Sequence, residues 1–336
     1  MRGGEGDGLR LDAARAADEI AEALRHQVGQ VLHRSGLVVA MSGGIDSSVC
    51  AALAVKAVGP GRVLGIALPE RDSDTGSVEL ARSVAEHFGI EFLVEDITPA
   101  LEGAGCYTRR DAAIARLVPY GPGWRSKLVV EGGGPDSDRL PLSYLVVRSP
   151  GGEERRLRLP VREHREIVAA TNFKQRVRTM LAYYHADRLQ YAVCGTPNRL
   201  EYELGFFVKG GDGLADVKPI AHLYKEQVYQ LAEHLGVPAA VRERTPTTDT
   251  YSLPQTQEEF FFSVPLAELD RLLAAHTAGR DAVTAARDLG LEPRQVERVY
   301  AEIDRKRRGA AYLHQAPLLV EPVLEHAAAT TGAGID

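Results

Sequence analysis

Short apolar runs alternate with longer stretches of helical periodicity along the first hundred residues. The runs 37–40, 63–68 and 91–94 are short and apolar, which indicates strands buried in a sheet. Residues 11–32 and 77–88 place apolar side chains three and four positions apart, and the stretch after Ser48 is rich in alanine, so all three predict helices. Strands and helices that alternate through short connections predict right-handed crossovers. The expected fold class is therefore α/β, a doubly wound parallel sheet with flanking helices.

The middle of the chain has a different pattern. Between residues 120 and 160, three pieces of alternating apolar and polar residues are separated by glycine and proline, which predicts a small inserted β-ribbon. Around and beyond it, the pattern predicts a strand at 191–194 and helices at 167–185, 222–235, 265–275, 282–289 and 293–308. We expect residues 11–322 to form a single domain, with residues 1–10 disordered and residues 323–336 a loose tail.

The most informative polar cluster lies between the first strand and the helix that follows it, in Met41-Ser42-Gly43-Gly44-Ile45-Asp46-Ser47-Ser48. Glycine lets the backbone turn sharply and lets a ligand approach its N–H groups, and the helix start adds a partial positive charge. This pattern favours a bound phosphate or pyrophosphate, contacted by Ser42, Gly43, Gly44, Ser47 and Ser48. Asp46 beside an anion suggests a bridging Mg²⁺ ion. The plain alternative is a tight loop in which Ser47 only caps the helix.

Composition narrows the classes of partner. The 336 residues carry a net charge of −6 with a pI near 6.0, which argues against a general polyanion binder and weakens RNA-directed functions. The three cysteines are far apart and form no Cys-x-x-Cys pair, so a structural zinc site or a disulfide framework is not expected. No apolar run reaches transmembrane length, and the N-terminus lacks the apolar core of a signal peptide. We therefore expect a cytoplasmic protein that binds neither nucleic acid nor membrane.

Further polar residues follow predicted strands or lie in glycine-rich loops. Thr196 comes directly after the strand at 191–194, and Glu201 follows five residues later. In a parallel sheet such positions meet at the carboxyl edge, where ligands bind. Lys225 opens a helix, where the dipole disfavours a cation unless an anion lies nearby, and Asp212 lies between glycines. Taken alone, Lys225 is explained as well by an exposed lysine, and Asp212 by a turn aspartate.

The order of these motifs resembles that of one enzyme family. Ser-Gly-Gly-x-Asp-Ser resembles the pyrophosphate loop of the ATP pyrophosphatases, which split ATP into AMP and pyrophosphate. The other motifs resemble the ammonia-dependent NAD synthetases of that superfamily: Asn172-Phe173-Lys174-x-Arg176-x-Arg178, Gly195-Thr196, Glu201, Gly205-Phe206-Phe207-x-Lys209-x-Gly211-Asp212-Gly213-x-x-Asp216, Pro219-Ile220-x-x-Leu223-x-Lys225 and Pro246-Thr247-x-Asp249. The resemblance spans about residues 11–322 and implies an adenine nucleotide α-hydrolase-like fold. It also implies amidation of deamido-NAD⁺ by ATP and ammonia through an acyl-adenylate.

The same resemblance implies roles for individual residues. Asp46 and Glu201 would hold Mg²⁺ on ATP, while Lys225 and Thr247 would neutralise the phosphate charge that develops in the reaction. The expected catalytic residues are Asp46, Lys225, Asp212 and Thr247, with Asp212 near the incoming ammonium. Thr196 would contact the nucleotide, and Arg71 would replace an arginine that family members often carry before Leu-Pro. The acid substrate would be held by Arg176, Phe206, Lys209, Asp212, Asp216, Lys306 and Arg307.

Three departures from the family pattern leave the identity of the acid open. The ribbon at 120–160 is an insertion, residues 254–258 read Pro-Gln-Thr-Gln-Glu in place of Gly-Gln-Thr-Asp-Glu, and Leu68-Pro69 lacks the preceding arginine. One alternative is an AMP-forming amide ligase for another carboxylic acid. A tRNA-modifying ATP pyrophosphatase is a further alternative that the acidic charge opposes. We expect ammonia to come from solution or from a separate glutaminase, and the resemblance implies a homodimer.

Overall fold

The computed structural model describes residues 9–132, 142–245, 250–262 and 264–321. Within these ranges no helix is both long enough and apolar enough to cross a membrane. The terminal segments 1–8 and 322–336, and with them most of the predicted loose ends, lie outside the described residues. Leu9 is described and is buried against the C-terminal helices.

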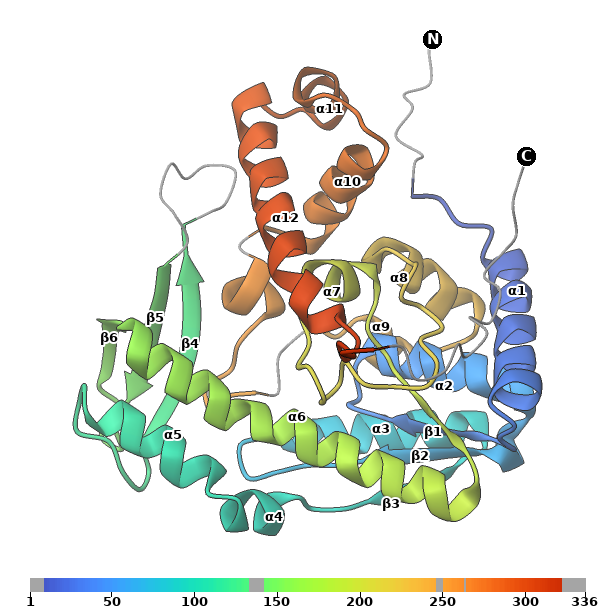
Figure 1. The fold of residues 1–336 in the computed structure, drawn as a ribbon, viewed down its shortest axis with the longest axis horizontal. Helices are drawn as coiled ribbons and strands as arrows, with labels where there is room; N and C mark the ends of the chain where they lie inside the picture. The colour runs from blue at the N-terminus through green and yellow to red at the C-terminus, as the bar shows by residue number, and fades with distance from the viewer. Residues whose placement is uncertain (1–8, 133–141, 246–249, 263, 322–336) are drawn as a thin grey trace.

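A four-stranded parallel sheet forms the centre of the molecule (Figure 1). Its strands lie in the order β3 (Glu91–Val94), β2 (Val63–Ala67), β1 (Leu37–Ala40) and β7 (Ala192–Cys194), and every neighbouring pair is parallel. The expected α/β class with a parallel sheet is confirmed. The carboxyl ends of β1 and β7 therefore lie side by side.

Both faces of this sheet are covered, because successive strand residues point to opposite sides. Leu37 and Val39 pack with α1 (Ala13–His26), α2 (Ile45–Val58), α3 (Thr75–Phe88) and α8 (Lys225–His234). Val38 and Leu64 pack on the other side with α4 (Thr98–Gly103), α5 (Cys106–Ala115) and α6 (Val161–Leu189). Short helical turns at Gln27–Val31, Pro60–Arg62 and Ala239–Arg242 complete this part of the fold.

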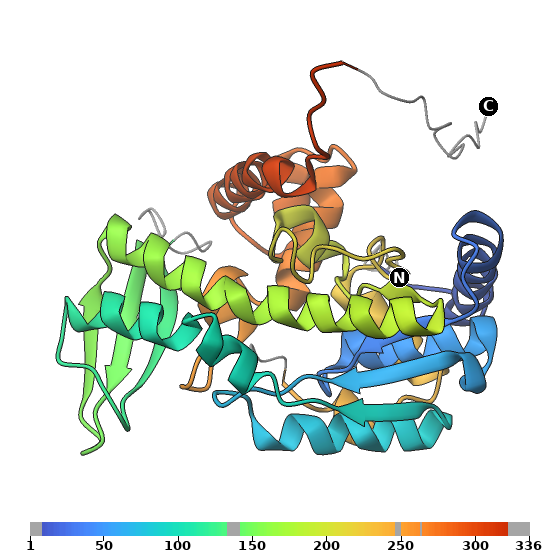
Figure 2. The same cartoon turned by 60° about the horizontal axis from the view of Figure 1, so that its bottom comes forward.

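The predicted β-ribbon is a separate three-stranded antiparallel sheet. Its strands are β4 (Arg125–Glu131), β5 (Leu142–Arg148) and β6 (Glu154–Arg158), with β5 in the middle. One face packs through Leu128 and Leu145 against residues of α5 and α6. The long helix α6 runs from this inserted sheet to the parallel sheet, and so ties the insertion to the centre of the fold (Figures 1 and 2).

A third cluster consists of helices from the C-terminal part of the chain. Helices α10 (Leu266–Thr277), α11 (Ala282–Leu289) and α12 (Pro293–His314) share a core with α7 (Arg199–Leu204) and with Phe262 of the turn η3 (Glu258–Phe262). The sequence predicted α10 and α11 closely, but α12 continues six residues beyond the expected end at Arg308. The short helices α4, α5 and α7 were not predicted. They contain few apolar residues in regular spacing, and Pro99 and Gly105 interrupt the pattern around α4 and α5.

Candidate active site

A cavity of about 1050 Å³ opens at the carboxyl ends of β1 and β7. Its walls come from the loop after β1, the loop after β2, helix α6, the segment 193–214, and the start of α8. Residues 128, 130 and 143 of the inserted sheet and residues 250–261 close the remaining side. The cavity thus lies where ligands bind in open α/β sheets.

The loop after β1 is shaped by hydrogen bonds among its own residues. Gly44 is the N-cap of α2 and offers no side chain to the first N–H groups of the helix. Ser47 Oγ and Ser48 Oγ both donate to the Gly44 carbonyl, at 3.0 and 2.9 Å. Gly43 has φ +71°, and a Cβ there would lie 2.5 Å from the carbonyl oxygen of Ser77. The loop therefore requires glycine at position 43 and leaves the N-terminal donors of α2 open to a ligand.

The members of this loop differ in how they face the cavity. Ser42, Gly44, Asp46 and Ser47 line it, whereas Ser48 is fully buried beneath the loop and Gly43 contributes no lining. Ser47 does not act as the helix cap, so the alternative of a plain capped turn does not describe this loop. The expected phosphate contacts therefore reduce to Ser42, Gly44 and Ser47, together with the backbone that Gly43 shapes.

Five side chains from distant parts of the chain meet at this loop. Lys225 Nζ forms an ion pair with Asp46 Oδ2, and Asn198 Nδ2 donates to Asp46 Oδ1 at 3.2 Å. Glu201 Oε2 accepts the Asn198 backbone N–H at 3.2 Å, in a capping box that starts α7. Gln257 Nε2 donates to Glu201 Oε1 at 3.0 Å. Asn198 thus holds both acidic side chains, one through its amide and one through its backbone.

The charges in this cluster perturb one another. Burial and the neighbouring Asp46 carboxylate together raise the pKa of Glu201 to about 8, although Lys225 lowers it in part. Burial alone would lower the pKa of Lys225, but the carboxylates of Asp46 and Glu201 outweigh it and raise that pKa. With this pKa Glu201 is mostly protonated at neutral pH beside the Asp46 carboxylate and the Lys225 ammonium, and a cation bound here would favour its ionised form.

The donor set fits a Mg²⁺ ion better than a transition metal. Among the described residues, no group of three or more His, Cys, Asp or Glu side chains converges as a metal site. Mg²⁺ does not require such a cage, because it usually binds one or two carboxylates and fills its other positions with water and substrate phosphates. Asp46 and Glu201 can supply these carboxylates at the edge of the pyrophosphate loop.

The far wall of the cavity carries several of the residues that the sequence assigned to the acid substrate. Arg176 donates from Nε and Nη2 to the Lys209 carbonyl, both at 3.3 Å, and Lys209 Nζ donates to the Tyr312 carbonyl at 2.8 Å. Phe206 lies beside them on the cavity wall. Asp212 accepts the Val208 N–H at 2.7 Å, and desolvation by the cavity walls raises its pKa to about 6, although part of the side chain is exposed. Arg176, Phe206, Lys209 and Asp212 all line the cavity, as does Thr196.

The structure places other predicted residues away from the cavity wall. Asp216 accepts the Val193 N–H at 2.7 Å and so caps the open edge of β7. Arg71 stacks over the Tyr107 ring at 3.5 Å. Lys306 donates to the Phe261 carbonyl, and burial lowers its pKa to about 8. Arg307 pairs with Glu203 on the outer side of α7 and α12.

None of these four residues lines the cavity as the described residues define it. The remaining predicted residue, Thr247, lies outside the described part of the chain.

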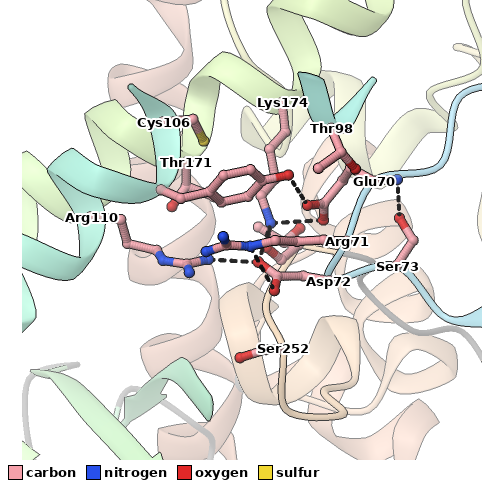
Figure 3. A network of polar contacts seen from close by, with 12 residues as sticks. Glu70, Arg71, Asp72, Ser73, Thr98, Cys106, Arg110, Thr171, Lys174 and Ser252 are labelled. Atoms are coloured by element: carbon pink, nitrogen blue, oxygen red, sulfur yellow. Dashed lines mark hydrogen bonds and ion pairs between the residues drawn. The ribbon is translucent and has the colours of Figure 1, made fainter. Parts of the chain in front are cut away.

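Two further groups of residues belong to the site although sequence reasoning did not single them out. Asn198 and Gln257 contact the two acidic residues directly. Beside the cavity, Lys174 Nζ donates to Glu70 Oε1 at 2.8 Å, to Asp72 Oδ2 at 3.0 Å and to the Thr250 carbonyl at 2.8 Å (Figure 3). The sequence held weak signals for both groups, since Asn198 follows a strand and Lys174 lies within the Asn-Phe-Lys motif.

Comparisons with known proteins show which family this chain resembles. A family model described as NAD synthase matches residues 16–114 and 155–309. The NH₃-dependent NAD⁺ synthetase of Rhizobium meliloti is 55% identical over 320 residues, which cover 95% of each chain. The synthetase of the same name from Thermotoga maritima is 35% identical over 270 residues, which cover 79% of this chain and 86% of that one.

Solved structures show the same fold. The NMN synthetase of Francisella tularensis aligns over 94% of this chain and 100% of that chain, with a TM-score of 0.62 and 22% identity. The NH₃-dependent NAD synthetase of Campylobacter jejuni aligns over 93% of this chain and 100% of that chain, with a TM-score of 0.60 and 19% identity. The segment between the two family matches, residues 115–154, contains β4 and β5 of the inserted sheet.

Proposed function

The chain belongs to the NAD synthase family, and we propose that its cavity carries out the ATP-dependent amidation of deamido-NAD⁺ to NAD⁺ with ammonia. The enzyme is a ligase that forms a C–N bond. The nicotinate carboxylate attacks the α-phosphorus of ATP, and pyrophosphate leaves with the electrons of the broken P–O bond. Ammonia then attacks the acyl carbon, AMP leaves from that carbon, and the amide nitrogen loses a proton.

The observation that carries this proposal is the cluster of Asp46, Lys225, Asn198 and Glu201 beside the start of α2. Ser42, Ser47 and the N–H groups after Gly44 face the position of a leaving pyrophosphate, whose charge the helix start favours. Lys225 adds an ammonium group that is paired with Asp46 in this structure. As the P–O bond breaks, the same ammonium group can stabilise the negative charge that develops on the phosphate. Bound by Asp46 and Glu201, Mg²⁺ would neutralise the triphosphate and orient it for attack.

The opposite wall suits an acid substrate that carries phosphates and flat rings. Arg176 and Lys209 provide positive charge, and Phe206 provides an aromatic face, all within the same cavity. Asp212, with a pKa near 6, is mostly ionised at neutral pH and can accept a proton from ammonium while remaining a weak base. Its carboxylate also attracts the ammonium cation before that transfer.

One assay tests the proposal. The purified protein is incubated with ATP, Mg²⁺ and NH₄⁺, and AMP release is measured with and without deamido-NAD⁺. We expect strong stimulation by deamido-NAD⁺ and formation of equal amounts of AMP and NAD⁺. Asp46→Ala should abolish AMP release, whereas Asp18→Ala, which removes only an exposed partner of Lys56, should not change it. Stimulation by a different carboxylic acid, with none by deamido-NAD⁺, would instead identify an amide ligase for that acid.

We further propose that the enzyme uses free ammonia or ammonia from a separate glutaminase, and that it works as a cytoplasmic homodimer. The dimer is supported by the exposed side chains of Met180 and Tyr184 on α6, each 58% exposed, because large apolar groups on one helix often mark an interface. A monomeric mass in solution would contradict the dimer. Turnover with glutamine alone, at the rate seen with ammonium, would contradict the nitrogen source.

A further inference from the structure

The segment 250–262 crosses one side of the cavity between the inserted sheet and α12 (Figure 1). We call it the crossing segment. Five of its residues line the cavity, namely Thr250, Tyr251, Gln257, Phe260 and Phe261. Its contacts with the rest of the fold decide where these five residues lie.

The middle of the crossing segment pairs with the free edge of the inserted sheet. Strand β4 is an edge strand, so its outer backbone groups are open to pairing. The Ser126 N–H donates to Ser252 Oγ at 2.9 Å, and the Leu253 N–H donates to the Ser126 carbonyl at 3.2 Å. Gln255 Nε2 donates to the Leu128 carbonyl, and the Gln255 side chain is 3% exposed. Hydrogen bonds to β4 therefore fix the position of the crossing segment.

Side chains on β4 strengthen this pairing. Lys127 Nζ forms an ion pair with Glu259 at 2.6 Å and donates to the Pro254 carbonyl at 3.3 Å. Val129 packs with Leu253 on the same face of the inserted sheet. The pair Lys127–Glu259 is only partly exposed, so solvent screens it less than a surface pair.

The far end of the crossing segment builds the aromatic wall of the acid half of the cavity. The Phe206 and Phe261 rings are stacked with centroids 4.9 Å apart, and the Phe206 and Phe260 centroids are 5.9 Å apart. Lys306 Nζ lies 4.2 Å from the centre of the Phe261 ring and donates to the Phe261 carbonyl. Phe206 thus depends on the crossing segment for its support.

We propose that the inserted sheet is a specificity element for the acid substrate, acting through the crossing segment. In this proposal Lys127 and Gln255 are positioning residues that hold Phe260 and Phe261 against Phe206. The sheet that supplies this support lies largely between the two segments of the family match, so the pattern shared by the whole family does not cover it. The identity of the acid, deamido-NAD⁺, rests on the proposed function.

Steady-state kinetics test the proposal with a pair of variants on the same sheet. Lys127→Met removes both contacts of the lysine to the crossing segment. Arg148→Met is the control, because Arg148 of β5 pairs with Glu154 of β6 at 2.9 Å, away from the β4 edge that contacts the crossing segment. We expect Lys127→Met, alone or with Gln255→Ala, to raise KM for deamido-NAD⁺ about tenfold, while kcat and the KM for ATP stay within about twofold. Arg148→Met should leave all three constants unchanged.

A second readout needs no substrate. Hydrogen exchange at the Leu253 amide should accelerate in Lys127→Met and not in Arg148→Met, because that N–H is held by the Ser126 carbonyl. Unchanged exchange would overturn the proposal even if deamido-NAD⁺ proved to be the wrong acid. An equal rise in KM for ATP and for the acid would also overturn it, since the segment would then act through Gln257 on Glu201 and not on the acid half.

Discussion

Lys225 occupies a position that the helix dipole makes unfavourable, at the first residue of α8. Two carboxylates on different elements compensate for the positive end of the helix dipole. Asp46 takes the ammonium directly, and Asp270 of α10 accepts the Glu226 backbone N–H at 2.7 Å. Asp270 thus satisfies a backbone N–H at the helix start, while Asp46 favours the charged form of Lys225. The lysine can therefore stay charged beside the cavity despite its burial.

Asp270 also makes stability depend on pH. Its Oδ1 is buried and has no hydrogen-bond partner among the described residues, and burial raises the pKa of Asp270 to about 6. An unfolded aspartate titrates near ~3.9, so between these values the folded state binds more protons than the unfolded state. This residue therefore lowers the free energy of unfolding as pH rises from about 4 to 6.

Asp270→Asn tests this dependence. The free energy of unfolding of the variant, relative to that of the wild type, should increase by about 1 to 3 kcal/mol as the pH rises from 4 to 7. Urea unfolding at several pH values measures this difference. Asp288→Asn, which alters an exposed pair with Arg280, is the matched control and should show no such trend. A stability difference that does not vary with pH would contradict the assigned pKa.

At the scale of one element, the turn from β1 into α2 depends on Gly43. Its left-handed backbone and the nearby Ser77 carbonyl each exclude a side chain. Gly43→Ala should therefore displace the donors that face the pyrophosphate and lower kcat by about 100-fold or more, a loss typical of a misplaced anion-stabilising donor. The measurement is AMP release at saturating ATP.

Gly59 supplies the control for backbone strain alone. It has φ +84°, and a Cβ there would meet no described atom within 4 Å. Gly59→Ala should cost about 1 to 2 kcal/mol of stability and leave kcat within about twofold. If both variants kept full turnover, the loop would not hold the leaving group.

The sequence predicted best those elements that are defined by interactions between residues close together in the chain. Strands β1 and β3 have the predicted bounds, because short apolar runs between turns define them locally. Helix α6 begins at Val161, six residues before the predicted start, because Pro160 can begin a helix that has no regular apolar spacing in its first turns.

The contacts that complete the site are of a different kind. Gln257 lies 56 residues from Glu201, so no local pattern indicated their contact. The order of the motifs predicted that Lys306 and Arg307 contact the substrate. It carried no information on their partners in the fold, which are the Phe261 carbonyl of η3 for Lys306 and Glu203 of α7 for Arg307.

At the scale of the whole molecule, one buried network joins four separate segments beside the cavity (Figure 3). Lys174 of α6 contacts Glu70 and Asp72 from the loop after β2, and it also holds the carbonyl of Thr250, where the crossing segment begins. From α5, Arg110 donates to Asp72 at 2.6 Å and Tyr107 donates to Glu70 at 2.7 Å.

The balance of charge explains why such a network can be buried. Burial opposes the charge on Asp72, but Lys174 and Arg110 outweigh it and hold the pKa of Asp72 below its ordinary value. Burial raises the pKa of Tyr107, and its hydrogen bond to Glu70 raises it further, so the phenol stays a donor. Two carboxylates and two cations thus leave no net charge, and all three ammonium protons of Lys174 have acceptors.

Removing the one cation that touches both carboxylates should therefore damage the whole molecule. Lys174→Met leaves the buried Glu70 carboxyl group with only the Tyr107 hydroxyl as its described donor, and we expect a loss of about 3 to 5 kcal/mol in the free energy of unfolding, measured with urea. The double variant Lys174→Met with Glu70→Gln should recover part of this loss, because it removes the carboxyl group that has lost its partner. Lys56→Met, which breaks an exposed pair with Asp18, should cost at most about 1 kcal/mol. Equal losses of free energy of unfolding in Lys174→Met and Lys56→Met would show that the network does not stabilise the packing of the sheet, α6 and the crossing segment.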